Sequence, residues 1–236
     1  MLLILQLKLN KMNQILSNIN IAVNENIYLK NPESSELGKK IIRGSIELIN
    51  EIGFEAFTFK KLGIQIKSTE ASIYWYFESK HKLLLYITSW YWVWMEYKIV
   101  FGLANITSPE KRLEKAIQIL VEEVENEEIF PHINENKLNQ IVIAESAKAY
   151  LTKEVDEDNK IGAYLAHKQL VARISDIVLE INPNYKYPNM LISTVIEGAH
   201  LQRYFAQHLP RLTDVSEKQD LIPSFYNELV FKAIKK

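Results

Sequence analysis

Few residues in this chain have the spacing that catalysis or metal binding requires. Glu197 and His200 form a Glu-x-x-His pair, which puts two ligands on one helical face, but di-iron helical bundles need two such pairs. The acidic run at residues 122–128 winds around a helix instead of converging on a cation, so we interpret it as a solvated face. The chain has no cysteine, no glycine-rich phosphate loop and no Gly-x-Ser-x-Gly nucleophile. We therefore expect no enzyme activity, no metal and no cofactor.

A second group of residues, between Phe57 and Lys82, has the chemistry of nucleic-acid contact. Lysines attract phosphates regardless of sequence, while hydroxyl and aromatic side chains near a helix start can reach base edges or phosphate oxygens. Two short helices separated by a few residues form a helix-turn-helix, which sets its second helix in a major groove. The residues expected to contact DNA are Lys60, Lys61, Lys67, Thr69, Ser72, Tyr74, Trp75, Tyr76 and Lys80.

The second helix of this pair should have an inner and an outer face. At 100° per residue the inward arc holds Ile73, Tyr74 and Phe77, and the arc free to touch DNA holds Ala71, Ser72, Trp75 and Tyr76. Tyr74 is assigned a phosphate contact as well, through its hydroxyl. Two simpler interpretations stay open, namely Thr69 as only a helix cap and Tyr74 as an aromatic at the edge of the core.

Lys80 precedes a long predicted helix whose first backbone N–H groups already favour an anion. We therefore expect its ammonium to bind a DNA phosphate. The simpler alternative is an ordinary solvated charge.

The elements that carry these residues are predicted to be helical throughout. The chain has 236 residues, 47% of them hydrophobic and 24% charged, with only 7 glycines and no Asn-Gly or Asp-Gly hairpin signal. A helix is expected from Ser34 to Gly53, with short helices capped by Thr58 and by Ser68 or Thr69, and a long one after Ser79. Residues 34–82 contain eight basic and six acidic side chains, whereas the rest of the chain is acidic overall. A basic end on an acidic body suits a protein that meets a polyanion.

These residues resemble the DNA-binding domain of the TetR family of bacterial regulators over residues 34–82. The resemblance rests on the pair Gly53-Phe54, the cap Thr58 and the run from Thr69 to Lys80, which reads TEASIYWYFESK. It implies an all-α fold: a three-helix helix-turn-helix domain joined by a long helix to a larger helical domain for dimerisation and ligand binding. It also implies a ligand-responsive repressor that binds an inverted-repeat operator as a homodimer.

Two departures from the family pattern affect the expected site. The turn reads Ile66-Lys67-Ser68, without the usual glycine, which indicates either a different turn geometry or a strained Lys67. Glu70 and Trp75 stand where basic residues are common. Glu70 would repel a phosphate, and Trp75 can contact a thymine methyl but cannot make the bidentate guanine contact of an arginine. The operator sequence is therefore not predictable.

We expect three parts along the chain: an N-terminal arm at 1–33, the helix-turn-helix domain at 34–82 and a helical body at 83–236. Met1 and Met12 both remain candidate starts. In the body, helices are predicted at about 108–126, 136–151, 158–181, 188–207 and 217–235. Those at 158–181 and 188–207 carry apolar residues on two faces, so we expect them to pair with their copies in a four-helix dimer interface. A deeper core within one chain is the alternative.

The long helix after the DNA-binding motif is unusually aromatic. One stripe along it could border an apolar pocket for an aromatic or lipid-like ligand, with two polar partners from elsewhere in the body. The stripe is Tyr86, Trp90, Tyr97 and Phe101, and the partners are Tyr150 and His200. The alternative is that these rings simply fill a core.

The function predicted from the sequence is a DNA-binding transcriptional regulator that is not an enzyme. Its expected partners are operator DNA, a second copy of itself and a small apolar or aromatic ligand. The alternative is a helical interaction module that keeps the fold without binding an operator or ligand. With no signal peptide pattern and no apolar stretch long enough to span a bilayer, we expect a cytoplasmic protein without membrane contact.

Overall fold

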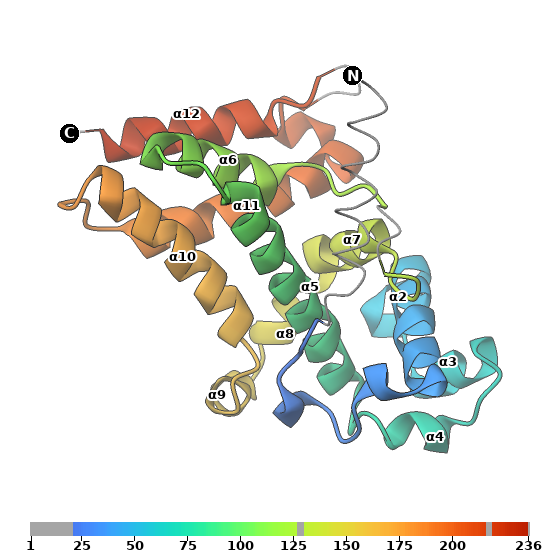
Figure 1. The fold of residues 1–236 in the computed structure, drawn as a ribbon. Helices are drawn as coiled ribbons and strands as arrows, with labels where there is room; N and C mark the ends of the chain where they lie inside the picture. Colours follow the sequence, from blue (N-terminus) through green and yellow to red (C-terminus); the bar gives the residue numbers. More distant parts are fainter. Residues whose placement is uncertain (1–20, 127–129, 216–218, 236) are drawn as a thin grey trace, which may run out of the picture. The chain divides into compact units, whose positions relative to one another are not determined.

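The protein is described by a computed structural model that covers residues 21–126, 130–215 and 219–235. Across these residues it consists of α-helices and three short 3-10 helices, without a β-strand (Figure 1). The all-α class predicted from the sequence is confirmed. Within the same ranges, no helix combines the length and the apolar character needed to cross a membrane.

The chain divides into two compact units that interleave along the sequence. Unit 1 comprises Met1–Trp90 and Val124–Val155, and unit 2 comprises Tyr91–Glu123 and Asp156–Lys236. The division falls within the long aromatic helix, so one continuous helix contributes its first half to unit 1 and its second half to unit 2. The boundaries predicted at 33/34 and 82/83 separate functional segments of the chain, whereas the units are compact parts of the fold. The functional boundaries stay a prediction.

Residues 21–33 pack into unit 1. They include the 3-10 helices η1 (Glu25–Ile27) and η2 (Pro32–Ser34), and Ile21 and Ile27 are buried. The backbone N–H of Leu29 donates to the carbonyl of Tyr76 at 2.8 Å. The predicted N-terminal arm therefore lies against unit 1 over this part, and its residues 1–20 lie outside the described residues.

Helix α2 (Glu36–Ala56) is the longest helix that lies wholly within unit 1. Ser35 caps it by accepting a hydrogen bond from the N–H of Gly38 at 3.1 Å. Gly53 has φ +75°, a conformation that suits glycine, and it interrupts the regular helix before Ala56. The chain then continues into α3 (Phe59–Gln65), α4 (Glu70–Tyr74) and α5 (Lys80–Leu103).

Two further helices complete unit 1, α7 (Glu135–Glu145) and α8 (Ala147–Tyr150), and α7 packs along α2 (Figure 1). Glu145 Oε1 accepts the N–H of Phe54 at 2.9 Å, just past the kink of α2. Glu145 Oε2 pairs with Lys148 at 2.8 Å. A buried, charge-assisted contact thus fixes the end of α2 that leads into the helix-turn-helix.

Unit 2 is a bundle formed by the second half of α5 and by α6 (Pro109–Val121), α9 (Val155–Lys160, from Asp156 on), α10 (Leu165–Ile181), α11 (Pro188–His208), η3 (Pro210–Leu212) and α12 (Ile222–Ile234). Its core consists of aliphatic side chains from facing helices, among them Leu170, Ile174, Val195, Ile196 and Val230. Ion pairs join neighbouring helices at the edge of this core, including Arg173 with Glu96 at 2.7 Å.

Several helix boundaries differ from the predicted ones. The helix expected at 158–181 is α9 and α10, because Gly162 adopts φ +83° between them. The helix expected at 136–151 is likewise two helices, α7 and α8. Helix α6 ends at Val121 instead of near residue 126, where acidic residues crowd and repel one another.

Candidate nucleic-acid interface

The helix-turn-helix is built by two side-chain caps and one unusual turn. Thr58 Oγ1 accepts the N–H of Lys61 at 3.2 Å to start α3, and Thr69 Oγ1 accepts the N–H of Ser72 at 3.2 Å to start α4. Between them Lys67 has φ +54°. Of the two alternatives left open by the sequence, the structure shows a Lys67 in the left-handed conformation. This conformation costs a residue with a Cβ atom about 1–2 kcal/mol, a cost that glycine does not have.

Helices α3 and α4 present one continuous exposed face. The largest exposed side chains on it are Ile64 at 72%, Trp75 at 71% and Tyr74 at 46% of their free area. The other exposed residues are Lys60, Lys61, Gln65, Lys67, Thr69, Glu70 and Ala71. This combination of exposed apolar side chains, lysines and hydroxyls has the composition needed to meet base edges in a groove flanked by phosphates.

Ile64 was missed by the sequence reasoning. Leu62, on the inner side of α3, is fully buried. Ile64 lies about 200° around the helix from Leu62, so an isoleucine opposite the buried face is the sequence signal that could have identified it.

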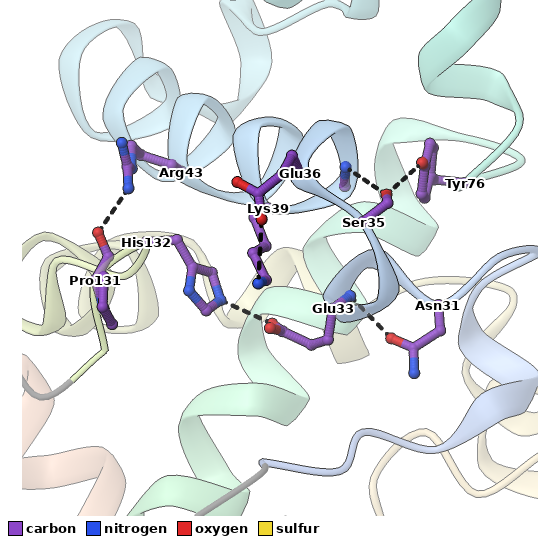
Figure 2. Close-up of polar contacts among 10 residues, drawn as sticks. Asn31, Glu33, Ser35, Glu36, Lys39, Arg43, Tyr76, Pro131 and His132 are labelled. Carbon is purple, nitrogen blue, oxygen red and sulfur yellow. Dashed lines mark hydrogen bonds and ion pairs between the residues drawn. The ribbon is translucent and has the colours of Figure 1, made fainter. Parts of the chain in front are cut away.

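Tyr76 does not belong to the exposed face, and its predicted place on the outward arc is wrong. Helix α4 ends at Tyr74 with Trp75 as its cap, so the helical period no longer applies at residue 76. Tyr76 is 2% exposed, and its hydroxyl lies 2.7 Å from the Oγ of Ser35 (Figure 2). Tyr74, predicted to face inward, is instead exposed, with its ring edge-to-face against Phe59 at 4.9 Å.

Lys80 has a different environment from the one predicted. Its Nζ donates to the carbonyl oxygens of Phe54 at 3.1 Å, Glu55 at 3.2 Å and Phe57 at 3.3 Å. It also lies 4.7 Å from the centroid of the Phe54 ring. These contacts satisfy the last carbonyls of α2 and join that helix to the start of α5. A DNA phosphate would have to compete with them for the ammonium.

The remaining residues predicted to contact DNA differ in whether their polar groups already form hydrogen bonds within the protein. Lys61 Nζ donates to the carbonyl of Ala56 at 2.7 Å. Ser72 Oγ donates to the carbonyl of Thr69 at 2.6 Å and lies 2.7 Å from Ser68 Oγ. The side chains of Lys60 and Lys67 are exposed and form no hydrogen bond or ion pair with any residue that the structure describes.

The aromatic stripe predicted for a ligand falls into both units. In unit 1, Tyr86 and Trp90 are almost fully buried, and Tyr86 packs edge-to-face on Phe77 at 5.4 Å. Burial is the main cause that raises the Tyr86 pKa well above its usual value, followed by the negative charge of nearby Glu33. In unit 2, Phe101 is 50% exposed and stacks near Tyr97 at 6.4 Å. Tyr86 and Trp90 are thus packed within unit 1, and their predicted ligand role stays a prediction.

The two polar partners proposed for that ligand lie in different units: Tyr150 in unit 1 and His200 in unit 2. His200 is buried near Trp92, whose ring stacks on His167 at a centroid distance of 4.0 Å. Burial lowers the pKa of each histidine to about 4, and the charge of His167 also lowers that of His200. The ligand role of these residues stays a prediction. Among the described residues, no group of His, Asp and Glu side chains is placed to hold a metal ion.

Sequence comparison assigns this segment to a known class. Residues 41–87 match the family described as "Bacterial regulatory proteins, tetR family". Tetracycline repressor protein class G of Vibrio anguillarum is 36% identical over 44 residues, which are 19% of this chain and 21% of that protein. The chain thus spans about a fifth of the curated relative that it matches. The predicted resemblance is confirmed: the helix-turn-helix segment matches the tetR family over residues 41–87. The match is to regulators, in agreement with the prediction that the protein is not an enzyme.

Structural comparison extends the likeness to the whole fold. AibR, in complex with isovaleryl coenzyme A and operator DNA, gives a TM-score of 0.57 at 17% identity, over 81% of this chain and 96% of that chain. The superantigen PfiT gives a TM-score of 0.55 at 12% identity, over 86% of this chain and 97% of that chain. At these identities the likeness establishes the fold alone, and proteins described as having different activities share it.

Proposed function

We propose that this protein is a transcriptional regulator that binds duplex DNA through the exposed α3–α4 face. The observation that carries the proposal is the coincidence of that face with the segment matching the tetR family. Lys60 and Lys67 supply phosphate attraction that does not depend on sequence. The exposed side chains of Trp75 and Ile64 are suited to the methyl groups of thymine.

We also propose that the regulator acts as a homodimer on an inverted repeat. Apolar residues of α11 such as Ile192, Val195 and Ile196 are buried within one chain. Helix α11 nevertheless keeps a separate exposed stripe, with Met190 at 68%, Leu201 at 52% and Tyr204 at 37%. Positions i, i+11 and i+14 lie on one helical face, so this stripe supplies an apolar surface for the α11 of a second copy. A twofold dimer would present two recognition helices to two half-sites.

The finer description is a ligand-responsive repressor acting in the cytoplasm. It is supported by the family match and by AibR, whose structure contains both an acyl coenzyme A and operator DNA. In this proposal residues 34–82 bind DNA, and residues 83–236 dimerise and respond to the ligand. Residues 1–33 are assigned to an N-terminal arm.

Selection of bound fragments from genomic DNA, followed by sequencing, tests the proposal. We expect enrichment of fragments that share an inverted repeat, with affinity that falls steeply from 50 to 200 mM salt as counterions are released. Recovery of no fragment above background, with a folded protein at micromolar concentration, would overturn it.

A second candidate is a helical interaction module that uses this fold without binding an operator. Two observations favour it: Glu70 is exposed on the α3–α4 face, and the superantigen PfiT shares the fold. Glu70→Lys distinguishes the candidates. A regulator that already binds DNA should gain affinity about equally for all sequences, whereas an interaction module without DNA binding should show at most weak, unselective attraction.

A further inference from the structure

A large pocket lies in unit 1, outside the α3–α4 face. It has a volume of about 1070 Å³ and is formed by the first turns of α2, the η2 segment, the residues before α7 and one residue of α5. Figure 2 shows this region, with Lys39 and Arg43 on α2 opposite Pro131 and His132. Sites for small organic molecules have about this size or less. Of the stripe predicted for a ligand from the sequence, only Trp90 lines it.

The charges that line the pocket favour an anion. Lys39, Lys40 and Arg43 face Glu33 and Glu36. Both carboxylates already have partners, because Glu36 pairs with Lys39 at 3.4 Å and Glu33 Oε1 lies 2.9 Å from His132 Nε2. With His132 counted as neutral, three cations and two carboxylates leave the pocket with a net charge of +1, and two of the cations form no ion pair with a described residue.

Those two remaining cations are Lys40 and Arg43, one turn apart on α2. The side chain of Lys40 is exposed and makes no hydrogen bond or ion pair with any residue in the described part of the chain. Arg43 Nη2 donates to the carbonyl of Pro131 at 2.6 Å, a contact that holds the guanidinium at the pocket rim. That bond occupies one donor, and a guanidinium has five, so the fork remains able to bind a second oxygen.

The inner wall of the pocket is aromatic and aliphatic. Trp90 and Phe130 meet edge-to-face at 4.9 Å, and Ile21 and Leu37 extend the apolar surface. An occupant of the pocket would therefore meet both apolar side chains and the two cations.

We propose that this pocket binds a free amphipathic organic anion, with an aromatic or aliphatic body on the Trp90–Phe130 wall and a carboxylate, sulfonate or phosphate head on Lys40 and Arg43. The bidentate geometry of arginine suits such a head, and its apolar body gains free energy by leaving water. The inference concerns the pocket alone and holds whether or not the α3–α4 face binds DNA.

Two fluorescent compounds that differ only in the anionic group test the proposal. 8-Anilinonaphthalene-1-sulfonate carries the head, and N-phenyl-1-naphthylamine is the same ring system without it. In the full chain, Lys40→Gln with Arg43→Gln should raise the Kd of the sulfonate about fivefold or more and change that of the neutral compound less than twofold. Lys111→Gln with Arg211→Gln removes the same charges from exposed positions outside the pocket and should leave both Kd values unchanged.

The apolar wall has its own test. Leu37→Ser should weaken both compounds by about threefold, whereas Leu151→Ser, at a position 77% exposed outside the pocket, should weaken neither. Far-UV circular dichroism melts verify that each variant is folded. If the double variant does not fold, Lys40→Gln alone carries the charge test, with an expected increase of about twofold in the sulfonate Kd.

Two results would overturn the proposal: a sulfonate Kd that is unchanged in the pocket variant, or one that changes equally in the control variant. The source of the anion is tested by displacement. Laurate below its micelle concentration should displace the sulfonate. If phosphatidylglycerol vesicles displace the sulfonate and laurate does not, the pocket binds a lipid headgroup and the proposal of a free ligand is wrong.

Discussion

At the scale of single residues, two histidines of unit 2, the half-buried His167 and the buried His200, tie stability to pH. His167 stacks on Trp92, and His200 lies in the same cluster. Burial holds both pKa values near 4, below the ordinary value of 6.5. Both side chains are therefore neutral in the folded protein at pH 7, and the unfolded chain binds protons more readily.

The sign of the pH effect follows from that difference. Because the folded pKa values are lowered, stability is full above about pH 6.5 and falls as the pH drops toward 4. One such histidine contributes a loss of about 2 kcal/mol in unfolding free energy between pH 7 and pH 5. We expect His200→Gln to lose less stability over this range than the wild type, by about that amount, in urea denaturation.

The control for this measurement is His208→Gln, because His208 is exposed at the end of α11. It should keep the full pH dependence of the wild type. An unchanged pH dependence in His200→Gln would contradict the assignment.

At the scale of elements, Lys80 connects the end of α2 to the start of α5 through three carbonyl oxygens. Lys80→Met keeps most of the aliphatic stem and removes the donors. We expect it to lower the unfolding free energy by about 2 kcal/mol, because charge-assisted hydrogen bonds to backbone carbonyls are lost. The salt dependence of DNA binding should change little.

Lys60→Met is the matched variant on α3, where the side chain is exposed. It should leave the melting temperature unchanged and reduce the slope of log affinity against log salt by about one. The opposite pattern, with Lys80→Met fully stable but reduced in salt slope, would restore the phosphate role predicted from the sequence.

The sequence predicts a feature of these elements when the residues that cause it are close together in the chain. The caps Thr58 and Thr69 bond to residues three positions away, so the starts of α3 and α4 are visible in the sequence. Tyr76 could not be placed, because its partner Ser35 is 41 residues away and the helical period ends at Tyr74. The carbonyl partners of Lys80 lie 23 to 26 residues earlier in the chain. The helical period of the sequence does not predict contacts at that separation.

The pocket in unit 1 shows the same limit at larger range. Its walls come from segments around residues 21, 31–43, 90 and 130–132. Each segment contains ordinary surface or core residues. Only tertiary packing brings two cations and two aromatic rings into the lining of one pocket.

At the scale of the whole molecule, dimer formation rests on the exposed stripe of α11. Leu201→Glu places a charge at the centre of the proposed contact, where burial without a partner is costly. We expect this variant to sediment as a monomer of 27.5 kDa at micromolar concentration while the wild type sediments as a dimer.

Leu229→Glu on α12 is the control, because Leu229 is also exposed, at 38%. It should remain dimeric. Dissociation by both variants, or by neither, would remove α11 from the interface.

The central claim, that the α3–α4 face binds DNA, is tested most directly by the fluorescence of Trp75. The chain has 4 tryptophans. Trp75 is 71% exposed, whereas Trp90, Trp92 and Trp94 are each at most 7% exposed. Acrylamide in solution should therefore quench Trp75 selectively. We predict that saturating selected DNA shields this quenchable emission, and that Trp75→Phe abolishes the difference between free and bound protein. DNA binding that leaves the quenching of Trp75 unchanged would contradict the account.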